Sequence, residues 1–99
     1  QALRQHEHGY KNMEHILKAS IDQGASYVSF WGLAYKNILE RSDSELGQIY
    51  KLLEDGCPKL GQICIENNIQ THFVGDHTLL PISTQKSMHT LEKDTQACT

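Results

Sequence analysis

No stretch of this 99-residue chain is apolar for long enough to cross a bilayer, and no segment resembles a signal peptide. A basic stripe is also absent: nine Lys and Arg residues are outnumbered by twelve Asp and Glu residues, and the formal net charge is −3. The long-range field of such a chain repels polyanions, so we expect no nucleic-acid partner. The sequence also has no internal repeat, low-complexity tract or flexible linker.

The three cysteines have no CxxC spacing. An odd number of cysteines without a secretory segment indicates a reducing, cytoplasmic setting. Cys57 and Cys64 are seven positions apart. On a helix they share a face but are separated by about 10 Å along the axis, which is too far for an unstrained disulfide. We expect both to be small core residues rather than metal ligands or nucleophiles.

Apolar residues at three- and four-residue spacing predict three helices, over residues 8–23, about 43–66 and 81–98. Gly24 is the expected stop of the first helix, and the Asn67–Asn68 pair is the expected stop of the second.

The start of the second helix has its own signals. Ser42 or Asp43 can cap it, and Glu45 places an acidic side chain in its first turn. Pro58 removes one helical hydrogen bond, so we expect a kink or an interruption there.

Two apolar segments between these helices predict β-strands. Ala25–Leu33 is rich in β-branched and aromatic residues, and its near-continuous apolarity fits a strand covered on both faces. Ile69–Val74 shows some alternation. A strand, a long crossover helix and a second strand form a right-handed βαβ unit. The predicted fold class is therefore α/β, in the order helix–strand–helix–strand–helix, with a mostly parallel sheet flanked by helices and completed by strands from outside this chain.

A polar loop follows the first predicted strand and carries the amide of Asn37 and the guanidinium of Arg41. In an open α/β sheet, ligands bind at the carboxyl ends of the strands. A planar, permanently charged guanidinium suits a phosphate or a diphosphate. The loop is thus the first candidate for a ligand site.

Four segments resemble, in the same order, motifs of the cis-prenyltransferases of the undecaprenyl diphosphate synthase type. His6–Met13 resembles the GHxxG stretch, with Gln5 in place of the first Gly, and Tyr27–Ser42 resembles the strand and loop written YAFSxENWxRS. Val74–Pro81 resembles the GDxxxLP turn, and Leu91–Thr95 resembles the AExxT run. The resemblance covers nearly the whole chain.

The resemblance implies roles for individual residues. His6 and Arg41 would contact the diphosphate of an allylic substrate, and Gly9, at the opening of the first helix, would allow close backbone approach. Asn37 would be the catalytic residue near the reacting carbon. Two further substrate-binding positions would be Trp31 and Ala34, and the prenyl tunnel would be lined by Leu46, Ile49, Tyr50 and Leu53.

The resemblance also implies what lies outside this chain. The DGNxRWA motif, whose Asp organises Mg²⁺ and the diphosphates, is expected upstream of Gln1, and the NYGGR and RxGGExRxSNF motifs are expected after Thr99. We therefore expect residues 1–99 to be a partial domain of a longer, cytoplasmic, homodimeric enzyme that is inactive as this fragment alone. The parent would condense isopentenyl diphosphate onto an allylic diphosphate with cis double-bond formation. It would use Mg²⁺ bound by the missing flanks and associate peripherally with a membrane through its lipid product.

Departures from the motifs leave alternatives open. Lys36 replaces the usual Glu, Ile38 the usual aromatic and Ala34 the usual Ser, and one residue is inserted between Asn37 and Arg41. One alternative is a noncatalytic cis-prenyltransferase-like subunit that supports a catalytic partner. Another is an unrelated flavodoxin-like binding domain.

Overall fold

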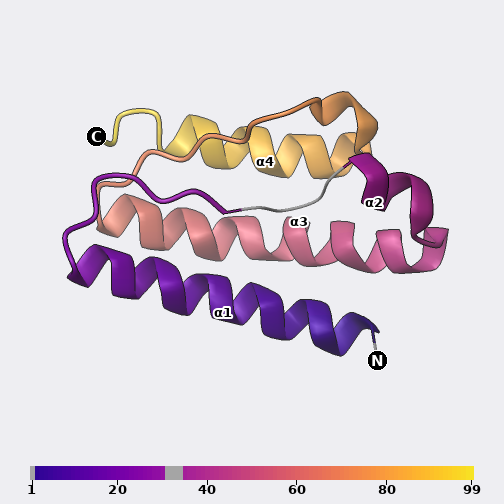
Figure 1. The fold of residues 1–99 in the computed structure, drawn as a ribbon. Helices are drawn as coiled ribbons and strands as arrows, with labels where there is room; N and C mark the ends of the chain where they lie inside the picture. The colour runs from indigo at the N-terminus through magenta and orange to yellow at the C-terminus, as the bar shows by residue number, and fades with distance from the viewer. Residues whose placement is uncertain (1, 31–34) are drawn as a thin grey trace. The chain divides into compact units, whose positions relative to one another are not determined.

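The computed structural model describes residues 2–30 and 35–99, with side chains described for residues 5–30 and 38–99. The elements of the described residues are all helical: α1 (Ala2–Asp22), α2 (Tyr35–Glu40), α3 (Asp43–Glu66), the 3₁₀-helix η1 (His77–Leu79) and α4 (Ile82–Asp94) (Figure 1). The chain divides into two compact units, residues 1–49 and residues 50–99, and each is described here by itself.

In the first unit, α1 begins at Ala2 rather than at residue 8, and it ends where the glycine predicted it would. Gly24 has a φ of 76° and donates its N–H to the carbonyl of Ile21, while Ala25 donates to Ser20. This pair of hydrogen bonds around a left-handed residue is a Schellman motif, for which glycine has the lowest steric cost.

The start of α3 is also determined by residues next to it in the sequence. The hydroxyl of Ser42 accepts the backbone N–H of Glu45 at 3.1 Å, so Ser42 caps the helix as predicted. Asp43 and Glu45 lie in the first turn, where negative charge is favourable. The segment before it differs from the prediction, because Tyr35–Glu40 forms the short helix α2 rather than an open loop.

Helix α3 runs through Pro58 without interruption, so the break that proline predicted does not occur. It ends at Glu66, and two residues later Asn68 has a φ of 58° and donates its N–H to the carbonyl of Ile65. The N–H of Ile69 reaches the carbonyl of Cys64 at 2.8 Å, which completes a second Schellman motif. The predicted stop at Asn67–Asn68 is confirmed.

The core of the second unit lies between α3 and α4. Its buried members are Cys57, Met88 and Leu91, and the half-buried side chains around them are Leu53, Leu60, Phe73 and Leu80. A polar contact joins the same two helices, because Glu54 Oε2 accepts the hydroxyl of the fully buried Thr84 at 2.6 Å and that of Ser83 at 3.0 Å. Burial of Cys57 and Cys64 confirms their predicted core role.

The predicted α/β fold class is wrong for the described residues. Neither residues 25–30 nor residues 69–74 form a strand, so the parallel pair and the βαβ unit are also wrong; residues 31–33 lie outside the described residues. A strand needs hydrogen bonds to a neighbouring strand, and sequence pattern alone cannot supply that neighbour. Two of the side chains expected in a sheet core instead face solvent, since Tyr27 is 94% exposed and Val74 is 96% exposed.

Residues 69–74 have other partners for their backbone. The N–H of Thr71 donates to Thr95 Oγ1 at 3.0 Å, and the N–H of Phe73 donates to Glu92 Oε2 at 2.7 Å. Both acceptors belong to α4 and its C-terminal cap, beside which this segment runs (Figure 1). Side chains of a helix therefore satisfy two alternate N–H groups that a sheet would have paired.

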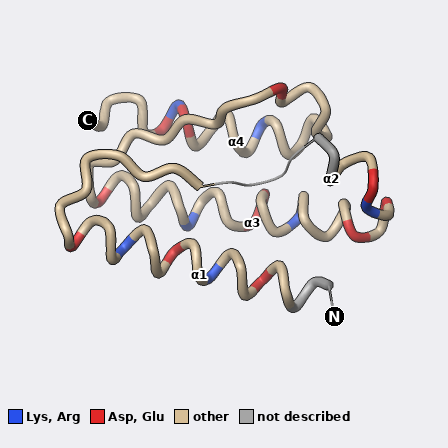
Figure 2. Tube along the Cα trace, in the orientation of Figure 1, with Lys and Arg blue, Asp and Glu red and all other residues tan. Residues whose placement is uncertain are grey.

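Charges of both signs are interspersed along α1 and α3 (Figure 2), in agreement with the mixed composition. None of the helices, over the residues described, is long and apolar enough to span a membrane.

The buried cysteines are expected to be slow nucleophiles. Burial, with a smaller effect of the Glu54 carboxylate, raises the pKa of Cys57 to about 11. At about pH 8 its thiolate fraction is then on the order of a hundredth of that of an ordinary thiol. We expect iodoacetamide to modify the half-buried Cys98 first and Cys57 only after denaturation, as followed by mass spectrometry. Equal rates for these two thiols in the folded chain would contradict the packing described here.

Candidate functional site

The first unit brings together two residues that the sequence predicted for one ligand. His6, on α1, places Nε2 at 3.0 Å from Glu45 Oε2. Arg41, between α2 and α3, places Nε at 3.5 Å from the same oxygen. The two donors thus converge on one carboxylate oxygen, although His6 and Glu45 are 39 positions apart in sequence.

Local structure positions each member of this cluster. Helix α1 carries His6, and the capped first turn of α3 carries Glu45. Arg41 and Glu45 are four residues apart, a spacing at which side chains of a helix and its leading turn can meet. Exposed fractions of 24%, 32% and 29% for the side chains of His6, Arg41 and Glu45 keep all three accessible to solvent.

Two members of the cluster carry groups of a kind that also binds anionic ligands. Arginine and histidine side chains are strong donors toward carboxylate and phosphate oxygens. A partly exposed i,i+4 pair such as Arg41–Glu45 contributes only about 0.3–0.5 kcal/mol to stability. This pair therefore adds little to the stability of the fold.

Other predicted site residues are less defined by the structure. Asn37 lies in α2, but its side chain is not among those described, and Trp31 and Ala34 lie outside the described residues. Gly9 lies within α1 rather than at its opening, and a Cβ built on it meets no described atom within 4 Å. The catalytic role of Asn37 and the substrate-binding roles of Gly9, Trp31 and Ala34 stay predictions.

The residues expected to line a prenyl tunnel lie on α3 at spacings that put them on one face, and they are Leu46, Ile49, Tyr50 and Leu53. Leu46 is buried and the other three are half-buried. Their place on an apolar face agrees with a lining role but does not test it.

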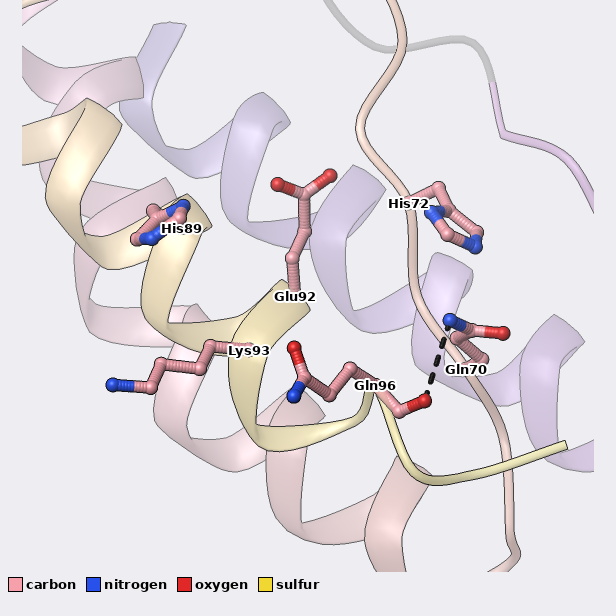
Figure 3. Close-up of a pocket in the computed structure, with 6 residues that line it drawn as sticks. All are labelled: Gln70, His72, His89, Glu92, Lys93 and Gln96. Atoms are coloured by element: carbon pink, nitrogen blue, oxygen red, sulfur yellow. Dashed lines mark hydrogen bonds between the residues drawn. The ribbon is translucent and has the colours of Figure 1, made fainter.

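A different set of residues lines the pocket shown in Figure 3, which lies in the second unit and has a volume of about 550 Å³. Its lining consists of Gln70, His72, His89, Glu92, Lys93 and Gln96. Two of these groups already have internal partners: Glu92 accepts the N–H of Phe73, and the Gln70 amide lies 3.5 Å from the carbonyl of Gln96. None of the predicted site residues lines this pocket.

Among the residues that the structure describes, no group of three or more His, Cys, Asp or Glu side chains could hold a metal ion.

A family model described as putative undecaprenyl diphosphate synthase matches residues 1–99 of the chain. The chain belongs to this family. It is also 26% identical over 95 residues to a curated di-trans,poly-cis-undecaprenyl-diphosphate synthase of Giardia intestinalis (strain ATCC 50803 / WB clone C6). That alignment covers 95% of the chain and 36% of the relative, so the chain spans about a third of the length of this prenyltransferase. No solved structure gives a significant match.

One member of the cluster was missed as a functional residue. Glu45 was predicted only as an acidic residue in the first turn of a helix. Its four-residue spacing from Arg41 is a local signal that could have paired the two. Its contact with His6 could not have been found from spacing, because it depends on how α1 and the start of α3 pack within the first unit.

Proposed function

We propose that this chain is part of a cis-prenyltransferase that condenses isopentenyl diphosphate onto an allylic diphosphate with cis double-bond formation. Family membership over the whole chain supports the reaction class. The observation that carries the site is the convergence of His6 and Arg41 on one carboxylate oxygen. Two donors that meet on one carboxylate oxygen could likewise meet on a phosphate oxygen, and this supports the proposed role of both residues.

Negative charge develops on the diphosphate as it leaves the allylic carbon, so cations fixed near its oxygens stabilise the transition state. Arg41 would supply a permanent charge and two or more N–H donors, and His6 would supply one further donor. Asn37 would orient the reacting groups near the allylic carbon. The other substrate contacts would come from Gly9, Trp31 and Ala34.

The apolar face of α3 would hold the growing chain. A polyprenyl product has no polar groups beyond its diphosphate, so it needs an aliphatic and aromatic lining. Leu46, Ile49, Tyr50 and Leu53 offer such side chains on one helix.

The complete enzyme would extend beyond this chain. We propose that its Mg²⁺ ligands lie in the flanking sequence, where the family resemblance predicts the Asp of the DGNxRWA motif. Bound Mg²⁺ would supply positive charge to the diphosphates. The enzyme would act as a homodimer in the cytoplasm and associate peripherally with membranes through its lipid product.

The reaction is tested by incorporation of labelled isopentenyl diphosphate with an allylic diphosphate as the acceptor. The full-length enzyme is expected to give polyprenyl products, and residues 1–99 alone are expected to give none above a blank. Elongation by the 99-residue chain would mean that the active site has been misplaced. A full-length protein that incorporates no label would point instead to the noncatalytic subunit.

A further inference from the structure

The two residues proposed to bind the diphosphate both contact an anion of the protein itself. His6 Nε2 and Arg41 Nε lie 3.0 Å and 3.5 Å from the same oxygen, Oε2 of Glu45. A carboxylate oxygen has the same sign of charge and accepts the same donors as a phosphate oxygen. Glu45 therefore engages the donors that the substrate would use.

These contacts are of a kind that exchanges readily. Arg41 reaches Glu45 through Nε at 3.5 Å, which is a longer contact than a paired fork-to-carboxylate bond. The side chains are a quarter to a third exposed, so water and salt weaken their attraction. The backbone N–H of Glu45 is bonded separately to Ser42, so the carboxylate can rotate away while the helix start stays capped.

On the basis of the proposed function, we propose that Glu45 is an internal competitor for the diphosphate and contacts His6 and Arg41 until the ligand displaces it. A diphosphate has more charge and more acceptor oxygens than one carboxylate, so it is the stronger partner for a guanidinium. A carboxylate that stayed in place would lie close to the bound diphosphate and repel it. Glu45 must therefore move, and the contacts that it gives up lower the apparent affinity for the ligand.

Glu45→Gln separates the charge of this residue from its shape. Glutamine is nearly the same size and keeps a carbonyl oxygen that accepts from His6 and Arg41, but it carries no charge. The probe is inorganic diphosphate, titrated into the full-length enzyme while the ring signals of His6 are followed by NMR and assigned with His6→Asn. We expect the dissociation constant in Glu45→Gln to fall about three- to thirtyfold.

Asp43→Asn is the matched control. It removes one negative charge from the same first turn of α3, but Asp43 is not the residue that His6 and Arg41 contact. We expect it to change the dissociation constant by less than about twofold, because an exposed charge farther from the ligand is screened.

The outcomes separate the inference from the function on which it rests. Tighter binding in Glu45→Gln with little change in Asp43→Asn supports competition. Binding in the unmodified chain that Glu45→Gln leaves unchanged or weakens overturns competition and leaves the diphosphate site standing. If His6 responds to diphosphate in none of the three proteins, both the site and the competition are overturned.

Discussion

Replacement of Arg41 by alanine in the full-length enzyme is expected to lower kcat/KM for the allylic diphosphate roughly 30- to 1000-fold. The variant loses a charge-assisted contact of about 2–4 kcal/mol to the leaving group. It also leaves Glu45 without the permanent positive charge of Arg41 beside it, so the carboxylate repels the substrate more strongly. Steady-state kinetics, with circular dichroism to confirm folding, measure the effect.

Three further variants show whether the effect belongs to the guanidinium. Arg41→Lys should recover only part of the activity, because an ammonium group cannot reproduce the planar fork. Asn37→Ala should lower kcat more than it weakens substrate affinity, if the amide orients the reacting groups. Lys18→Ala removes an exposed cation from α1 and should leave kcat/KM unchanged. An unchanged kcat/KM in well-folded Arg41→Ala would return Arg41 to the role of a surface residue.

Replacement of Leu91 by alanine is expected to lower the free energy of unfolding by about 2–5 kcal/mol. Leu91 is only 2% exposed and packs with Cys57 and Met88 in the core between α3 and α4. Removal of its isobutyl group loses buried apolar surface and leaves a cavity that the two helices can close only in part. Urea unfolding followed by circular dichroism measures the change.

Gly61 provides an internal check on that cavity. A Cβ built on Gly61 lies 3.1 Å from Leu91 Cδ1, a tight approach in the unmodified chain. Once Leu91 is alanine, the same methyl group has space, and alanine in place of glycine within a helix gains about 1 kcal/mol. Gly61→Ala should therefore stabilise the Leu91→Ala chain more than it stabilises the unmodified one. Equal effects in the two backgrounds would contradict the packing of Leu91 on Gly61.

The parts of the fold that could be predicted from sequence are those set by neighbouring residues. Gly24 and Asn68 end their helices because each adopts a left-handed conformation at low cost. Ser42 starts α3 because its hydroxyl reaches an N–H three residues on. Each of these features depends on a few consecutive residues, so the pattern contains the information needed.

The strands could not be predicted in the same way, because strand pairing depends on partners far along the chain. Partial alternation made residues 69–74 resemble a strand, but two of their N–H groups are instead bonded to Thr95 and Glu92. The first of these bonds depends on a residue far along the chain, since Thr71 and Thr95 are 24 positions apart. Hydrophobic pattern carries no information on such a choice.

The candidate site also combines residues that could be predicted from sequence with contacts that could not. His6 and Arg41 were predicted from motif resemblance, and their convergence on one oxygen is a result of how α1 and the start of α3 pack in the first unit. Glu45 was missed because its role depends on that packing and not on its place in a helix. A residue that pairs with a ligand-binding residue is thus harder to predict from sequence than the ligand-binding residue itself.

The central claim is that His6 and Arg41 act together on one diphosphate, and a double-mutant cycle tests it most directly. The dissociation constant of an unreactive allylic thiodiphosphate is measured for the full-length enzyme, His6→Ala, Arg41→Ala and the double variant. Residues that share one ligand group have coupled effects, so we predict an interaction energy of about 0.5–3 kcal/mol. Effects that add to within about 0.3 kcal/mol would contradict the claim, because they would mean that the two side chains act at independent places.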